Sequence, residues 1–232
     1  MTDAPLAIDF GTSNSAAAIL DGAAPRRLPV EGASDTLPTA VFFPLDGPMR
    51  IGAAAAEALI EGDEGRYMRA LKSVLGTPLF HEQRMLGGRR RTLALVVAAF
   101  LREVKARAEA AAGRRFETAL SGRPVRFHPD PARDARAEDD LRACYLAAGF
   151  RDVTFMYEPE AAALAAYGLG RAGEVGLVVD IGGGTSDFSA FRVEGGQVSI
   201  LASHGVRLGG TDFDHAVSMT HAMPLLGLHG EL

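Results

Sequence analysis

Cysteine is nearly absent from this sequence. The single residue, Cys144, excludes an internal disulfide bond and a cysteine-rich zinc site. Because Leu141, Tyr145 and Leu146 around it follow a helical spacing, we interpret Cys144 as a small residue in or near the core.

Long apolar runs and an excess of positive charge are missing as well. No run of about 18 apolar residues occurs, and the N-terminal MTDAPLAID lacks the basic and apolar regions of a signal peptide. We therefore expect a soluble, cytoplasmic protein. The net charge of −5 argues against a nucleic-acid partner, and against an anionic membrane surface, reached through bulk electrostatics.

Several catalytic signatures are also absent. The sequence has no G-x-x-x-x-G-K-[ST] loop, no G-x-S-x-G elbow, and no i, i+4 histidine pair with a glutamate between them. These absences argue against a Walker-type NTPase and a zinc hydrolase. Residues 168–173 fit G-x-G-x-x-G, but they follow a predicted helix and not a strand, so we interpret them as a linker.

A glycine-rich stretch is the most informative feature that is present. In LVVDIGGGTSDFS, residues 177–189, an apolar strand leads to Asp180, three glycines and then Asp187. Glycine allows a tight turn whose N–H groups converge on one point, which suits phosphate. The two aspartates could hold Mg²⁺ through water molecules. A plain glycine-rich hairpin turn is the alternative.

The same design occurs near the N-terminus. In LAIDFGTSNSAAAIL, residues 6–20, Asp9 corresponds to Asp180 and Gly11 to Gly182. A repeated strand, aspartate and glycine turn indicates two related halves that face a shared cleft. With 232 residues, of which 47% are apolar, the chain can bury the core of one large or two small domains.

Periodicity predicts the remaining elements. Helices are expected at residues 53–60, 66–75, 92–113 with Thr92 as N-cap, 130–148, 158–167 and 213–223. Strands are expected at residues 6–10, 15–20, 28–30, 37–43, 116–120, 125–127, 153–156, 176–181, 187–193 and 197–203. We interpret the basic run of Arg84 and residues 89–91 as a solvated hairpin rim beside Gly87 and Gly88.

At these motifs the sequence resembles the ATPases of the actin, sugar-kinase and heat-shock chaperone superfamily. IDFGTSNS and VVDIGGGTSDFS are similar to its two phosphate motifs, and YEPEAAALAAYG to its helix between lobes. Within the superfamily the sequence most resembles the DnaK-type, seventy-kilodalton heat-shock family, especially its YegD-like branch. The segments at 122–125 and 149–162 carry that likeness.

The resemblance implies an α/β fold with actin-like, ribonuclease H-like lobes, in which helices flank mixed sheets. The first lobe would span residues 1–170, with a core subdomain (1–36 and 114–170) and an inserted subdomain (37–113). Residues 171–232 would begin a truncated second lobe. The family's third glycine-rich motif and its adenosine-binding helix are not found, so we expect weak or no ATP binding by this chain.

The resemblance also implies roles for individual residues. Asp9 and Asp180 would hold Mg²⁺ through its waters, Thr185 and Asp187 would lie near the attacking water, Lys72 would be the catalytic lysine, and Glu158 would relay the nucleotide state. An ordinary exposed lysine is the alternative for Lys72. The nucleotide would be bound by Gly11, Thr12, Ser13, Asn14, Gly182, Gly183, Gly184, Thr185, Gly209 and Gly210.

The function implied is that of a nucleotide-binding domain of a DnaK-type chaperone, which binds and hydrolyses ATP to ADP with Mg²⁺. Unfolded polypeptides and co-chaperones would be partners through C-terminal parts absent from this sequence. Two alternatives stay open. One is a small-molecule, sugar-type kinase of the same superfamily, and the other is a non-catalytic, actin-like interaction module.

Overall fold

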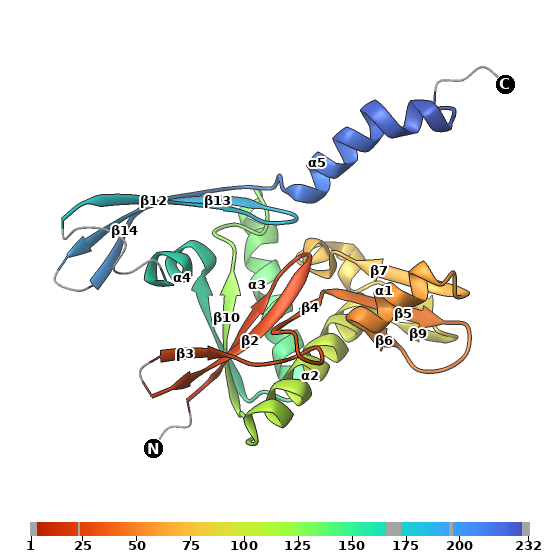
Figure 1. Cartoon of the computed structure of the whole chain (residues 1–232), viewed down its shortest axis with the longest axis horizontal. Coiled ribbons are helices and arrows are strands. Elements are labelled where there is room, and N and C mark those ends of the chain that lie inside the picture. The colour runs from red at the N-terminus through yellow and green to blue at the C-terminus, as the bar shows by residue number, and fades with distance from the viewer. Residues whose placement is uncertain (1–3, 23, 166–172, 195–196, 229–232) are drawn as a thin grey trace.

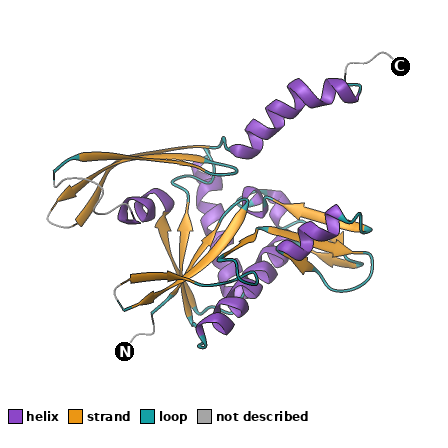
Figure 2. Cartoon of the chain, in the orientation of Figure 1, coloured by secondary structure: helices purple, strands orange, loops and turns teal. Residues whose placement is uncertain are grey.

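The computed structural model describes residues 4–22, 24–165, 173–194 and 197–228. It has a mixed α/β architecture in which a large sheet with flanking helices lies below a separate three-stranded sheet (Figure 1). Figure 2 shows the same arrangement by type of element. Within the described ranges, no helix is long and apolar enough to cross a membrane.

The large sheet positions the first predicted turn. Its strand order is β11-β10-β1-β2-β3, and β4 also pairs with β2. Strands β1, β10 and β11 are parallel, whereas β1 and β2 form an antiparallel hairpin. The bounds are β1 Leu6–Phe10, β2 Asn14–Asp21, β3 Ala24–Arg27, β4 Thr36–Pro38, β10 Thr118–Arg123 and β11 Asp152–Tyr157.

Two long helices, α2 (Leu93–Ala112) and α3 (Pro131–Ala147), pack against each other beside this sheet (Figure 1). Helix α2 begins where the Thr92 hydroxyl accepts a hydrogen bond from Leu95 N (3.3 Å), and it ends at Gly113, whose φ of 67° is left-handed. Asp130 caps α3 in the same way, by accepting from Arg133 N. Both predicted helices are thereby confirmed.

The main core lies between these helices and the sheet. Strand β1 alternates, so that Leu6, Ile8 and Phe10 point into the core. The Phe10 ring lies 5.8 Å from the Phe100 ring of α2. The side chain of Tyr145 is fully buried. Its hydroxyl donates to Ser121 Oγ at 2.8 Å, and this hydrogen bond offsets the cost of burying a polar group.

Residues 40–91 form a smaller unit at the side of the large sheet (Figure 1). Its sheet has the order β6-β5-β7, and α1 packs on it. The β8–β9 hairpin contains the basic run, as predicted. The bounds are β5 Ala40–Pro44, β6 Arg50–Ile51, α1 Ala53–Ile60, β7 Gly65–Arg69, η1 Leu71–Val74, η2 Pro78–Phe80, β8 Arg84–Leu86 and β9 Arg89–Arg91.

The second sheet repeats the opening hairpin, as the sequence predicted, and has the order β12-β13-β14. Helix α4 precedes it and α5 follows it, leading away from the rest of the chain (Figure 1). The bounds are α4 Glu158–Ala165, β12 Val175–Ile181, β13 Ser186–Glu194, β14 Gln197–Val206, α5 Gly210–Val217, η3 Ser218–Ala222 and η4 Met223–Leu226. The predicted helix at 213–223 is thus α-helical only in its first part.

Two element predictions are wrong because tertiary pairing overrides the local pattern. Residues 66–75 are not a helix: β7 pairs with β5, Ala70 takes a left-handed φ of 55°, and the short 3₁₀ helix η1 follows. Residues 125–127 are not a strand, because Val125 N donates to Asp187 and Phe127 N donates to Asp134.

Two other predictions are misplaced. The strand expected at 28–30 lies earlier, as β3. The strand expected at 37–43 is divided at Thr39 between two sheets, because β4 pairs with β2 of the large sheet whereas β5 pairs with β6 and β7. The predicted end of the helix at 166–167 and the linker at 168–172 lie outside the described residues.

Candidate functional site

The candidate site lies at the carboxyl ends of the parallel strands of the large sheet. Asp9 is near the end of β1, Gly122 near the end of β10, and Glu158 directly follows β11. Parallel strands end at one edge of a sheet, which is where such folds bind ligands. A cavity of about 730 Å³ opens at this edge.

The first glycine turn, residues 11–13, forms one wall of the cavity. It joins β1 to β2 so tightly that a Cβ on Gly11 would lie 2.2 Å from Asn14 O. Only glycine therefore fits this position without a shift of the backbone. Ser13 and Asn14 are exposed in the cavity.

The second glycine turn, residues 182–185, forms the opposite wall. Gly182 N donates to Thr185 O (2.9 Å), which closes the turn between β12 and β13. A Cβ on Gly183 would lie 2.3 Å from Ser13 Oγ, so the two turns touch. The repeated motif thus brings two turns from distant parts of the sequence to one cavity.

Lys72 reaches the cavity from η1. Its side chain is 9% exposed, and Nζ lies 2.5 Å from Glu158 Oε1. The left-handed Ala70 immediately precedes η1, and such a non-glycine conformation is costly and concentrates at functional sites. Lys72 is therefore not the ordinary exposed helix lysine that the sequence also allowed.

Asp9 and Asp180 face the same cavity from the two halves. Asp9 is exposed as a residue, but the protein around its carboxyl group partly excludes water from it. This desolvation raises the pKa of Asp9. The positive charge of Lys72 opposes the rise, while the charges of Glu158 and Asp180 add to it. Desolvation and the charge of Glu158 likewise raise the pKa of Asp180. Negative charge is therefore in excess between the two turns.

Asp187 lies in β13, two residues after the second glycine turn, and not on the cavity wall. It is buried, its Oδ1 accepts from Val125 N at 3.3 Å, and a Cβ on Gly205 would lie 2.5 Å from that oxygen. Desolvation and the charge of Glu158 raise the pKa of Asp187 to about 6. A carboxyl of this kind exchanges a proton near neutral pH.

Most of the predicted site residues come together in the structure. The cavity lining includes Asp9, Gly11, Thr12, Ser13, Asn14, Lys72, Glu158, Asp180, Gly182, Gly183 and Thr185. Gly184 lines a small adjoining hollow with Thr12 and Lys72. Gly209 and Gly210 lie behind the second glycine turn, where Gly210 N donates to Gly182 O (2.9 Å).

Some cavity residues were not predicted from the sequence. Gly122 faces Glu158, and a Cβ there would lie 3.3 Å from Glu158 Cγ. A glycine near a strand end can signal such a close approach. Met156, Ala161 and Ala162 also line the cavity, but their residue types carry no chemical signal.

Comparison with known proteins adds a family context. The family model described as "Hsp70 protein" matches residues 81–224, more than half of the chain. The chain is 36% identical over 219 residues to the chaperone protein DnaK of Methanothermobacter thermautotrophicus and 33% over 220 residues to that of Endomicrobium trichonymphae. The DnaK of Cenarchaeum symbiosum is 31% identical over 219 residues.

These alignments cover 91% of the chain but 35%, 34% and 32% of the three relatives, respectively. The chain therefore spans about a third of the length of these curated relatives. The mixed sheet and flanking helices agree with the actin-like ATPase fold expected for such proteins.

Proposed function

Because the chain belongs to the Hsp70 family, we propose that its cavity holds the phosphates of ATP or ADP between the first and second glycine turns. The observation that supports this most is the contact of Ser13 with Gly183 beside Asp9, Asp180 and Lys72. Hydroxyl and backbone donors, carboxylates and a cation are the groups that phosphoryl transfer requires.

The residues present fit Mg²⁺. Asp9, Asp180 and Glu158 outnumber Lys72 in this part of the cavity, and their mutual repulsion contributes to the raised pKa values of the two aspartates. Within the described ranges, no group of three or more side chains is arranged to bind a metal directly. Two aspartates acting through water molecules suit Mg²⁺, which retains much of its hydration shell. Bound there, it would neutralise phosphate charge.

The remaining roles follow from position. Lys72 supplies positive charge beside the phosphate-binding turns, and Glu158 holds its ammonium group in place. Thr12 and Ser13 supply hydroxyl donors from the first glycine turn. Thr185 lies on the cavity wall and Asp187 is buried behind it. Asp187, with a pKa of about 6, would therefore take the proton of attacking water through an intervening water molecule.

The biological role is also proposed from membership of the family. ATP hydrolysis would serve chaperone action on unfolded polypeptides, aided by co-chaperones, in the cytoplasm. Those partners would bind through regions of the relatives that this chain does not span.

A ligand that contains phosphates but no base tests the proposal most directly. We expect Mg²⁺ with tripolyphosphate to raise the melting temperature, because the groups expected to bind phosphate lie on this chain. Binding stabilises a fold by about 2.7 kcal/mol at a ligand concentration of 100 Kd. The shift should require Mg²⁺ and should be lost in Asp9→Asn/Asp180→Asn, whereas the exposed-site control Asp46→Asn should retain it.

The proposal fails if the unsubstituted chain shows no Mg²⁺-dependent shift, or if the double variant shows the same shift. Isotope-labelled ATP then separates the functions. If the unsubstituted chain releases labelled phosphate into water and Lys72→Ala does not, the chain hydrolyses ATP. If the label appears in an added sugar, the chain is a kinase. Self-association without nucleotide binding indicates an interaction module.

A further inference from the structure

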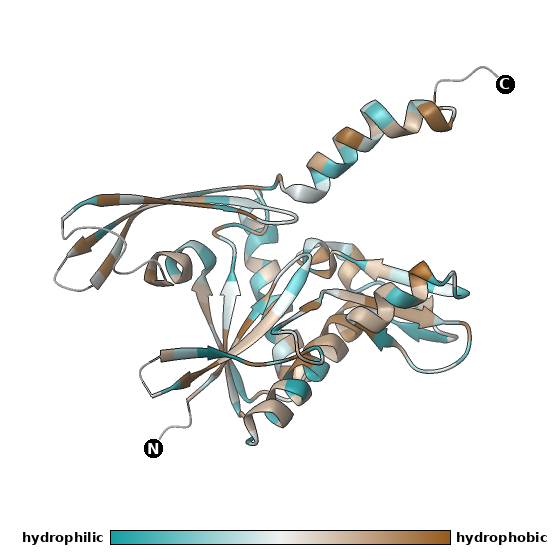
Figure 3. Ribbon diagram, viewed as in Figure 1, coloured by the Kyte–Doolittle hydropathy of each residue, from teal (hydrophilic) through white to brown (hydrophobic). Residues whose placement is uncertain are grey.

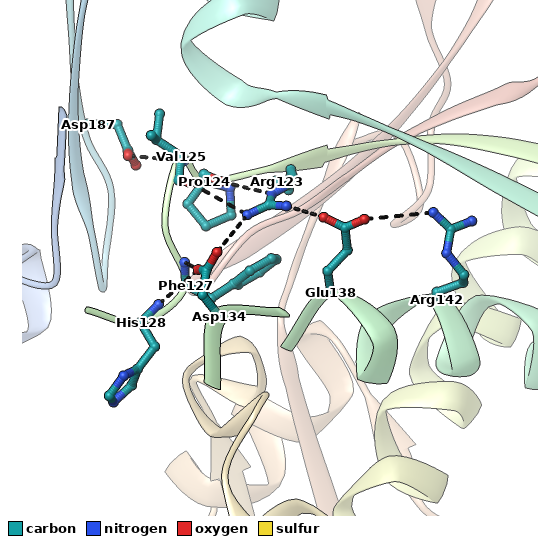
Figure 4. A network of polar contacts seen from close by, with 9 residues as sticks. All are labelled: Arg123, Pro124, Val125, Phe127, His128, Asp134, Glu138, Arg142 and Asp187. Atoms are coloured by element: carbon teal, nitrogen blue, oxygen red, sulfur yellow. Dashed lines mark hydrogen bonds and ion pairs between the residues drawn. The ribbon is translucent and has the colours of Figure 1, made fainter. Parts of the chain in front are cut away.

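Arg123, the last residue of β10, is a buried arginine with several partners (Figure 4). It is 8% exposed. Its guanidinium forms ion pairs with Asp134 (3.4 Å) and Glu138, both on α3, and its Nε donates to Pro124 O at 3.1 Å. A planar guanidinium with several fixed acceptors has little freedom to move.

Two aromatic rings restrict the same side chain further. The guanidinium carbon lies 5.0 Å from the centre of the Phe127 ring and 5.2 Å from that of Tyr157. Such cation–π contacts strengthen where water is excluded. Arg123 therefore connects the ends of β10 and β11 to helix α3.

The segment that follows, residues 124–128, is held by the same group of residues. Asp134 Oδ1 accepts from Phe127 N (2.6 Å) and from His128 N (3.2 Å), while Asp134 Oδ2 faces Arg123. The segment thus forms no strand ladder. Val125 N instead donates to Asp187 Oδ1 across the two halves (Figure 4).

We propose that Arg123 is a positioning residue: it holds residues 124–128 against α3 so that the Val125 N–H is aimed at Asp187. Arg123 then links helix α3 to the second glycine turn without contacting the cavity. This structural link does not depend on the proposed function. Its catalytic consequence, the orientation of Asp187 toward water, rests on that function.

Arg142 provides a matched control. It also faces Glu138 (3.8 Å), and it donates to Val153 O at 2.7 Å, but no hydrogen bond or ion pair joins it to residues 124–128. Loss of Arg142 therefore removes an arginine from α3 but leaves residues 124–128 bound to Arg123 and Asp134.

Amide hydrogen exchange of the nucleotide-free chain, read by NMR at Val125, tests the link. In Arg123→Met we expect Val125 N–H to exchange about tenfold faster or more, while core amides of α2 such as Val97 N–H keep their rates. Arg123→Lys should recover part of the protection, and Arg142→Met should leave it unchanged. Asp187→Ala should speed exchange at Val125, because it removes the acceptor.

Unchanged exchange at Val125 in Arg123→Met, or equal acceleration in Arg142→Met, would overturn the proposal. Should Arg123→Met fail to fold, Glu138→Gln, which removes one charged partner, must show the faster Val125 exchange. Phosphate release is a separate readout: Arg123→Met should lower turnover with nucleotide affinity kept, and have no further effect in Asp187→Ala. Absence of any turnover where ATP is shown to be bound would count against the proposed function and leave the exchange result standing.

Discussion

The two halves of the repeat have the same sequence pattern but opposite burial. Leu6 in β1 is 0% exposed, whereas its counterpart Leu177 in β12 is 66% exposed. Val179 and Ile181 are exposed as well, and Figure 3 shows hydrophobic segments along this second sheet. In contrast, the polar Asp187 and Ser189 of β13 are buried.

The difference teaches what a local motif can specify. Alternating apolar residues before an aspartate and a glycine make a strand and a turn in both halves. Burial depends on a covering layer. Helices α2 and α3 supply that layer for β1, and within the described residues nothing covers the Leu177 face of β12. An apolar face of this kind is typical of a surface that contacts other protein.

The largest effect should come from the matched leucines. Leu6→Ala is expected to lower the free energy of unfolding by about 2–5 kcal/mol, because it leaves a cavity in the core. Leu177→Ala should change it by less than about 0.5 kcal/mol. Urea denaturation of both variants measures this. Similar losses at the two positions would show that the exposed face of β12 is covered in solution.

The corresponding glycines should give the next effect. Gly11→Ala is expected to cost about 1–3 kcal/mol, since the new methyl group would meet Asn14 O at 2.2 Å. At Gly182 the nearest atom, Thr185 O, would be 3.4 Å away, so Gly182→Ala should cost less than about 0.5 kcal/mol. Thermal unfolding compares the two variants, and an equal cost would contradict the stated geometry of the first glycine turn.

The last difference should be a pH dependence that comes from Asp187, which has no acidic counterpart in the first hairpin. Asp180 pairs across the hairpin with Asp187, whereas Asp9 pairs with Ala16. The pKa of Asp187 is about 6 in the folded chain and about 3.9 when unfolded. Between these values the folded state binds more protons, so this group's contribution to stability increases as pH falls from 6 to 4 and is lost above 6.

Asp187→Asn keeps an acceptor for Val125 N but does not titrate. It should therefore be more stable than the unsubstituted chain above pH 6, with a difference that shrinks toward pH 4. Denaturation at several pH values measures the difference. A difference that stays constant from pH 4 to pH 8 would mean that Asp187 has no raised pKa.

Sequence reasoning succeeded where the signal was local. The Thr92 cap and the two hairpins each rest on neighbouring residues, and the structure has them. The repeat also predicted that two distant turns would face one cavity. The roles assigned to Asp9, Lys72 and the other site residues stay predictions.

The failures share a physical cause. Met68, Leu71 and Leu75 have helical spacing, yet pairing of β7 with β5 decided the structure there. The partner of Val125 is Asp187 on β13, 62 residues away in sequence, so no local pattern could reveal it. Long-range contacts of this kind override weak local preferences.

The contact between Ser13 and Gly183 limits how the two halves can move. Since even a single methyl group on Gly183 would lie 2.3 Å from the serine oxygen, the turns have no space left to approach by translation. A closer approach of the two turns would first require the Ser13 side chain to rotate away. The absence of a side chain at Gly183 thereby allows the two turns to lie in contact.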